Sequence, residues 1–191
     1  PVAVGAHAVG RLGSVKRMNI LVLGAGPIGL FAQQCASLTG ALTIYISDIN
    51  TARLRVAQEL GAHRVFDPNR VDLVKEIVRL TEIGADIAFE CAGAQPTLQQ
   101  ALELVRWGGR VMLVSLAWEQ VDCLPVEWVG REVELKACYA SLNSEWFISF
   151  ALMQQKKIKT APMISKIIGL SEIQGAFQEL LKPENNQIQV V

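Results

Sequence analysis

The stretch Ile20–Leu30, ILVLGAGPIGL, joins an apolar run to three closely spaced glycines. Its four leading aliphatic residues are typical of a strand that is buried on both faces. Gly24, Gly26 and Gly29 follow, and Pro27 stands where a helix would begin, a position at which its missing N–H group costs little. The stretch therefore predicts a strand, a tight glycine turn and a helix, in that order.

The spacing of the three glycines suits a phosphate group. Gly24 permits the tight turn, Gly26 leaves room for a pyrophosphate against the backbone, and Gly29 allows close packing of helix on strand. The first turn of the helix offers unpaired N–H groups and a partial positive charge. Because the motif directly follows a strand and opens a helix, we expect Gly24, Gly26, Pro27 and Gly29 to bind a dinucleotide.

An acidic residue stands where such a motif requires one. Asp48 lies about 20 residues beyond Gly29, at the end of the next predicted strand, where a carboxylate accepts hydrogen bonds from the adenosine ribose. A carboxylate there would repel a 2′-phosphate, so we expect NAD and not NADP as the cofactor.

Three different roles for the glycines fit the sequence less well. A plain glycine turn followed by a helix-capping Asp48 would not explain the regular spacing of Gly24, Gly26 and Gly29. Methyltransferases that use S-adenosylmethionine also have a glycine-rich first loop, but theirs usually follows an acidic residue and has a closer third glycine. A P-loop is excluded because no Gly-Lys-Ser/Thr sequence follows.

The rest of the chain alternates between strand-like and helix-like segments, which predicts an α/β fold of the Rossmann type, with a doubly wound, parallel, six-stranded sheet and helices on both faces. We expect a turn at Gly108-Gly109 and an irregular segment at Leu116–Gly130. The tail, Gln187–Val191, resembles the start of a further strand. The six predicted strands are Asn19–Leu23, Leu42–Ile46, Arg64–Phe66, Asp86–Glu90, Arg110–Val114 and Glu132–Cys138, and the predicted helices are Pro27–Thr39, Asn50–Leu60, Val71–Leu80, Pro96–Val105, Ser144–Gln155 and Ser171–Leu181.

Composition narrows the class of protein. The 191 residues suit one domain, 51% of them are apolar, and 18 basic residues balance 18 acidic ones. We expect no nucleic-acid partner, because a basic surplus is absent, and no membrane span, because no apolar run approaches ~18–20 residues. Neither the four cysteines nor the two histidines have the spacing of a metal or redox motif. Reduced cysteines then favour a cytoplasmic protein.

Beyond the glycine loop and Asp48, residues 86–114, DIAFECAGAQPTLQQALELVRWGGRVMLV, carry a resemblance to a known family. The chain resembles the coenzyme-binding domain of the medium-chain, zinc-dependent alcohol and polyol dehydrogenases, most of all the branch with the sorbitol, butanediol and threonine dehydrogenases. DINTARLRVAQELGA and GLSEIQGAFQELL resemble later parts of that domain. The resemblance implies that 1–191 is an NAD-binding Rossmann domain, with 1–17 leading in from an N-terminal catalytic domain and 187–191 returning to it.

The resemblance also implies roles for individual residues. Arg53 should lie along the adenine or ribose, although a solvated charge is an alternative. Cys91 should pack at the crevice and is a weaker candidate for a nucleophile. The residues that should face the nicotinamide half of the cofactor are Ile28, Cys91, Ala92, Val114, Ser115, Leu116, Cys138, Tyr139 and Ala140.

The resemblance places zinc only in the N-terminal domain, since the family's metal ligands match nothing here. In the intact enzyme we expect hydride transfer between a secondary alcohol and NAD, whereas this polypeptide alone should bind NAD weakly and turn nothing over. A non-catalytic dinucleotide-binding module and a zinc-free quinone or enoyl reductase remain alternatives. We expect a homo-oligomer, with Trp118 and Trp128 at an interface, unless these residues are simply buried under the sheet edge.

Overall fold

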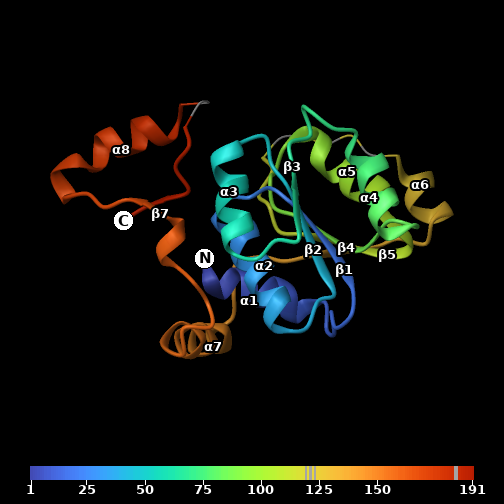
Figure 1. Ribbon diagram of the computed structural model, residues 1–191, viewed down its shortest axis with the longest axis horizontal. Helices are drawn as coiled ribbons and strands as arrows, with labels where there is room; N and C mark the ends of the chain where they lie inside the picture. The colour runs from blue at the N-terminus through green and yellow to red at the C-terminus, as the bar shows by residue number, and fades with distance from the viewer. Residues whose placement is uncertain (119, 121, 123, 183–184) are drawn as a thin grey trace.

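A computed structural model describes residues 1–118, 120, 122, 124–182 and 185–191. Its centre is a six-stranded sheet in which every neighbouring pair of strands is parallel (Figure 1). The strand order is β3-β2-β1-β4-β5-β6, which confirms the predicted Rossmann fold. The six strands are β1 (Asn19–Leu23), β2 (Thr43–Ser47), β3 (Arg64–Phe66), β4 (Ala85–Glu90), β5 (Val105–Leu113) and β6 (Glu134–Ala137).

Helices cover both faces of this sheet. Helices α1 (Val2–Arg11), α2 (Pro27–Leu38) and α3 (Thr51–Glu59) share one apolar core with the sheet, and α4 (Leu73–Thr81) and α5 (Gln95–Leu104) share the other. Side chains in β1 alternate between the two cores, as the period of a strand requires. Ile20 and Val22 join the first core, and Leu21 and Leu23 join the second.

The predicted turn at Gly108-Gly109 is wrong, because both glycines lie inside β5. The pairing of β5 with β4 passes from Ala85 opposite Val105 to Ile87 opposite Arg110, so the four residues 106–109 stand opposite Asp86 alone. Gly108 takes a φ of +62°, a conformation that glycine adopts without strain. The glycine pair therefore makes a bulge within a longer strand.

The predicted irregular segment contains one short helix, α6 (Pro125–Gly130). Cys123 and two other residues of this segment lie outside the described residues. Trp118 is 92% exposed, which rules out its burial under the sheet edge.

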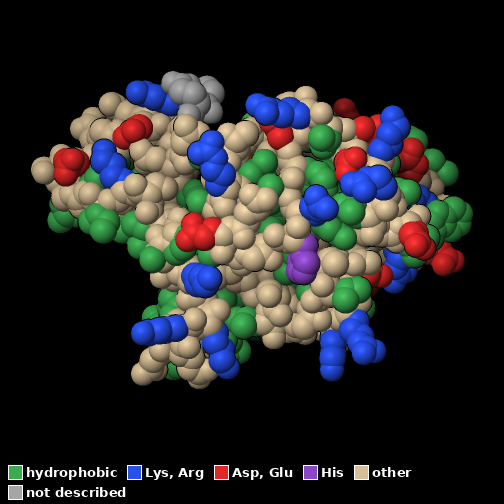
Figure 2. Space-filling model, viewed as in Figure 1, with side chains coloured by type: hydrophobic (Ala, Val, Ile, Leu, Met, Phe, Trp, Pro, Cys, Tyr) green, Lys and Arg blue, Asp and Glu red, His purple; other side chains and the backbone are tan. Residues whose placement is uncertain are grey.

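The last part of the chain stands to one side of the sheet (Figure 1). Helix α7 (Asn143–Gln154) packs on α1, and the C-terminal lobe consists of β7 (Ile164–Lys166), α8 (Ile173–Leu180) and β8 (Gln189–Val190). Strands β7 and β8 pair in parallel, which gives the predicted tail strand its partner. Hydrophobic side chains line the lower edge of this lobe in Figure 2, while charges of both signs are scattered over the same view. In the part of the chain that the structure describes, no helix is long and apolar enough to cross a bilayer.

Candidate cofactor-binding site

The strand order reverses between β1 and β4, and the loops that follow these strands flank a crevice. At such a reversal the helices after the two strands lie on opposite faces of the sheet, which leaves the carboxyl ends open. The backbone stays tied to the neighbouring strands just beyond their ends. The Gly24 N–H donates to the Ser47 carbonyl at 2.8 Å, and the Cys91 N–H donates to the Leu23 carbonyl at 2.9 Å.

The three glycines meet three different steric conditions. Gly24 has a φ of +101°, and a Cβ there would lie 2.9 Å from the Ala92 nitrogen. A Cβ on Gly29 would lie 2.0 Å from the Gly24 carbonyl oxygen, so helix α2 contacts its own loop at that point. A Cβ on Gly26 would meet no heavy atom within 4 Å. Gly24 and Gly29 are therefore needed by the fold itself, whereas Gly26 keeps an open space clear.

The open space at Gly26 faces the first turn of α2. Gly26 is the N-cap of this helix and Pro27 is its first residue, and no side chain caps the N–H groups of that turn. Those N–H groups and the helix dipole together can bind an anion. The loop thus fits a pyrophosphate, as its sequence predicts.

The carboxylate of Asp48 reaches the same loop from the end of β2. One oxygen accepts a hydrogen bond from the Ala25 N–H at 2.6 Å, and the other accepts one from the Asn50 N–H at 2.7 Å. Asn50 caps α3 through its own side chain, which accepts from the Ala52 and Arg53 N–H groups. Asp48 therefore does not cap the helix, and its half-buried carboxylate lies beside the glycine loop.

Arg53 points toward the C-terminal segment. Its Nη2 donates to the Gln187 carbonyl at 3.2 Å, while its buried Nε has no partner in the structure. Next to it, the Asn50 side chain donates to the Asn185 carbonyl at 3.0 Å. The chain just before β8 is thus held beside the start of α3, and contact of Arg53 with adenosine stays a prediction.

A cavity of about 470 Å³ lies beyond the ends of β4 and β5. Eight of the residues predicted for the nicotinamide half line it, together with Val4 of α1 and Gly93. Ala140, on its wall, takes a φ of +52°, which is uncommon for a residue with a Cβ. The eight are Ile28, Cys91, Ala92, Val114, Ser115, Leu116, Tyr139 and Ala140.

Cys138 is the predicted nicotinamide-side residue that does not line this cavity. It is 5% exposed and packs in the core that β1 shares with α1 and α2. Burial raises the pKa of the Cys138 thiol. The pKa of Cys91 is also raised, first by burial and then by the nearby charge of Glu90. Raised thiol pKa values disfavour the thiolate, so neither cysteine is suited to act as a nucleophile at neutral pH.

Glu90, the last residue of β4, is the main part of the site that the sequence prediction missed. It is 1% exposed, and its Oε1 accepts hydrogen bonds from the N–H groups of Ala92 and Gly93 at 3.0 and 2.8 Å. The Thr97 hydroxyl lies 2.7 Å from the same oxygen, and the Ser115 hydroxyl donates to Oε2. Glu90 therefore joins the loop after β4 to the end of β5. An acidic residue that closes an otherwise apolar strand was the available signal.

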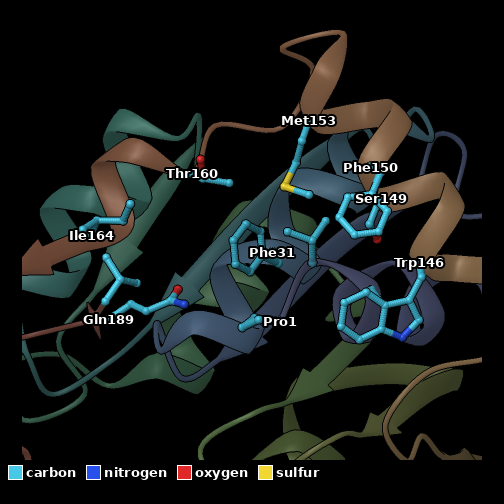
Figure 3. A pocket seen from close by; sticks show the side chains of 12 residues that line it. Pro1, Phe31, Trp146, Ser149, Phe150, Met153, Thr160, Ile164 and Gln189 are labelled. Atoms are coloured by element: carbon cyan, nitrogen blue, oxygen red, sulfur yellow. The ribbon is translucent and has the colours of Figure 1, made fainter. Parts of the chain in front are cut away.

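A second cavity, of about 210 Å³, lies between α1, α7 and β7 (Figure 3). Phe31, Trp146, Phe150 and Met153 surround it, and no acidic or basic side chain lines it. Its polar side chains are those of Ser149, Thr160 and Gln189. The described residues also include no cluster of three or more His, Cys, Asp or Glu side chains able to hold a metal ion.

Comparison with known proteins identifies a family for the chain. The sequence profile of the zinc-binding dehydrogenases matches residues 27–155, which include the whole of α2, Asp48 and most of the cavity wall. The chain belongs to the zinc-binding dehydrogenase family.

Relatives of this chain include an L-idonate dehydrogenase and a sorbitol dehydrogenase. The chain is 31% identical to L-idonate 5-dehydrogenase of Vitis vinifera over 185 residues, which cover 93% of this chain and 50% of that enzyme. It is 30% identical to sorbitol dehydrogenase of Homo sapiens over 186 residues, 95% of this chain and 52% of the relative. The chain thus spans about half the length of the curated relatives it matches.

A solved structure extends the likeness to the whole dehydrogenase chain. A zinc-binding dehydrogenase from Sinorhizobium meliloti 1021, bound to NADP, is 30% identical, with a TM-score of 0.88 over 100% of this chain and 56% of its own. The family match and these relatives favour the dehydrogenase interpretation over a non-catalytic nucleotide-binding module. The family is named for zinc, but the described part of this chain contains no group of three or more His, Cys, Asp or Glu side chains that could bind it.

Proposed function

We propose that this chain binds NAD in the crevice between β1 and β4 and orients it for hydride transfer to or from a secondary alcohol in the full-length protein. The observation that carries the proposal is the meeting of an uncapped helix N-terminus, the open space at Gly26 and the Asp48 carboxylate in one loop. The cofactor would supply the hydride acceptor or donor, and the chain would supply its binding and orientation. Residues 1–191 would form the NAD-binding part of the protein.

Each half of the crevice would bind one half of the cofactor. The N–H groups at the start of α2 would bind the pyrophosphate, and Asp48 would accept hydrogen bonds from the adenosine ribose. The cavity beside β4 and β5 would hold the nicotinamide, with Ile28 on one side and Val114 and Ser115 on the other. Its volume of about 470 Å³ suits a ring of that size with room for a substrate carbon next to it.

We propose NAD as the preferred form. Asp48 has both oxygens committed to backbone N–H groups of the loop region, which fixes a negative charge where a 2′-phosphate would have to lie. The related Sinorhizobium meliloti structure is bound to NADP, so NADH and NADPH are compared directly in the test.

Cofactor titration tests the proposed function directly. Full-length protein is titrated with NADH and, separately, with NADPH, and bound cofactor is followed by its fluorescence. We expect saturable binding of NADH and binding of NADPH at least about tenfold weaker, as a fixed like charge at the 2′-phosphate would cause. Tighter NADPH binding would overturn the assignment of Asp48, and no binding of either at millimolar concentration would overturn the function.

Substrate screening addresses the other half of the reaction. We propose a polyol or another secondary alcohol, on the basis of the L-idonate and sorbitol dehydrogenase relatives. Formation of NADH with a panel of polyols, compared with primary alcohols and with quinones, distinguishes this proposal from a quinone or enoyl reductase. The cytoplasm, where thiols stay reduced, is our proposed location.

We also propose a homo-oligomer formed through the β6 edge of the sheet. This edge strand has no neighbour on its outer side among the described residues, and Val126 and Val129 of α6, the helix that precedes it in the chain, are 67% and 77% exposed. Unpaired edges and exposed apolar side chains both favour association. Light scattering over a range of concentrations should show a dimer or larger species, and Val129→Asp should dissociate it, whereas a wild-type monomer throughout would overturn the interface.

A further inference from the structure

Glu90 is a buried carboxylate with an unusual set of partners. Its Oε1 accepts from the N–H groups of Ala92 and Gly93 and lies near the Thr97 hydroxyl, which the Ala94 carbonyl shares, and the Ser115 hydroxyl donates to Oε2. Such a ring of donors stabilises the ionised form of a carboxyl group. The Glu90 carboxyl group therefore lies inside the protein on neutral hydrogen-bond partners, and no described Lys, Arg or His side chain forms an ion pair with it.

The position of this charge matters because of what it adjoins. Glu90 lines a hollow next to the nicotinamide cavity, and Gly93, Ser115 and Leu116 form part of both. Cys91, the residue that follows Glu90 in the chain, lines the nicotinamide cavity itself. In a partly buried site a unit charge acts over several ångströms, since little water screens it.

The two oxidation states of the cofactor differ in charge at the nicotinamide end. The oxidised ring is a cation, and hydride transfer makes it neutral, while the adenosine and pyrophosphate parts are unchanged. We propose that Glu90 sets the preference of this site between the two states by stabilising bound NAD⁺ relative to bound NADH. This inference rests on the proposed function, because it requires the nicotinamide to occupy the cavity beside β4 and β5.

A purely structural role for Glu90 makes a different prediction. The hydrogen bonds to Ala92 and Gly93 shape the loop, and loss of that shape would weaken the binding of NAD⁺ and the binding of NADH to the same extent. Loss of the charge alone would weaken the binding of NAD⁺ and leave the affinity for NADH nearly unchanged. The ratio of the two dissociation constants therefore separates the charge of Glu90 from its effect on loop geometry.

The test is binding calorimetry of NAD⁺ and of NADH with full-length wild-type, Glu90→Gln, Glu90→Ala and Glu90→Asp proteins. Both neutral variants should raise the ratio of the dissociation constant of NAD⁺ to that of NADH about tenfold, as expected for unit charges in a partly buried site. Such a change raises the reduction potential of the bound cofactor by about 30 mV. Glu90→Asp keeps the charge and should stay within about twofold of the wild-type ratio.

Glu59→Gln is the matched control, because Glu59 is an exposed residue at the end of α3 and its substitution removes the same charge. Circular dichroism identifies which of the neutral variants fold, and either one suffices. Equal weakening of NAD⁺ and NADH, or an unchanged ratio, would overturn the inference while leaving the proposed function intact. Failure of the wild-type protein to bind either form would instead overturn the proposed function.

Discussion

The two ends of the crevice achieve their shape in opposite ways. At the glycine loop, the backbone of one short segment forms the surface, and the Asp48 carboxylate accepts a hydrogen bond from it. At the nicotinamide end, the wall comes from the ends of several strands and from α1, and a buried side chain, Glu90, joins two of its parts. The first end depends on local sterics, and the second depends on contacts between segments distant in sequence.

Gly29→Ala is expected to have the largest effect, because it should unfold the glycine-loop end of the crevice. The new Cβ would lie 2.0 Å from the Gly24 carbonyl oxygen, and neither backbone can move away without parting α2 from β1. We expect a loss of about 3 kcal/mol or more in the free energy of unfolding, measured by denaturant titration. Gly10→Ala in α1 is the control, since its Cβ would meet nothing within 4 Å. Equal stability of the two variants would contradict the proposed packing role of Gly29.

Gly26→Ala should sharpen the contrast, because it separates binding from folding at the same loop. Gly26 has a φ of −73°, which alanine adopts readily, and its Cβ would point into open space. We therefore expect an unfolding midpoint close to that of the wild type and roughly 100-fold weaker NADH binding, since the methyl group would displace the pyrophosphate. Unchanged affinity in fluorescence titration would mean that no phosphate lies against Gly26.

Asp48→Ala should have a smaller effect on affinity and a clear one on cofactor choice. The variant loses hydrogen bonds made to a charged group, which corresponds to roughly tenfold weaker NADH binding. Removal of the negative charge should also narrow the preference for NADH over NADPH, as measured by parallel titrations. Asp67→Ala is the matched control, because Asp67 follows β3 and accepts a hydrogen bond from the Asn69 N–H in a similar way. A preference that stays at its wild-type value in Asp48→Ala would contradict the role of Asp48.

The smallest effect concerns the packing behind the nicotinamide end, where α7 meets α1. Burial alone would raise the pKa of Glu145, but hydrogen bonds from His7 and from the Leu142 N–H outweigh it and lower the pKa below its ordinary value of 4.5. A lowered pKa means that Glu145 stabilises the fold at neutral pH and that this contribution is lost as the pH falls below about 4.5. The thermal unfolding midpoint of the wild type should therefore lie above that of Glu145→Gln at about pH 7, and the two midpoints should converge toward about pH 3. A difference that does not shrink on acidification would contradict this assignment.

Most of the sheet could be predicted from the sequence, because each strand and helix has a local pattern of its own. The bulge at Gly108-Gly109 could not, since a glycine pair suits either a turn or a bulge. Only the pairing of β5 with β4 selects the bulge. Of the two-stranded β7–β8 sheet only the tail strand was predicted, because a strand of two or three residues is defined by its partner and not by its own sequence.

The sequence by itself determined the glycine loop, the position of Asp48 and the order of strands and helices, since these follow from backbone sterics and periodicity over a few residues. Only the tertiary structure decided which side chains share a wall. Glu90 appears in the sequence as one acidic residue after DIAF, and its partner Ser115 lies just beyond a different strand. The folded sheet brings the two together and buries the carboxylate, and burial is what gives its charge any reach toward a bound nicotinamide.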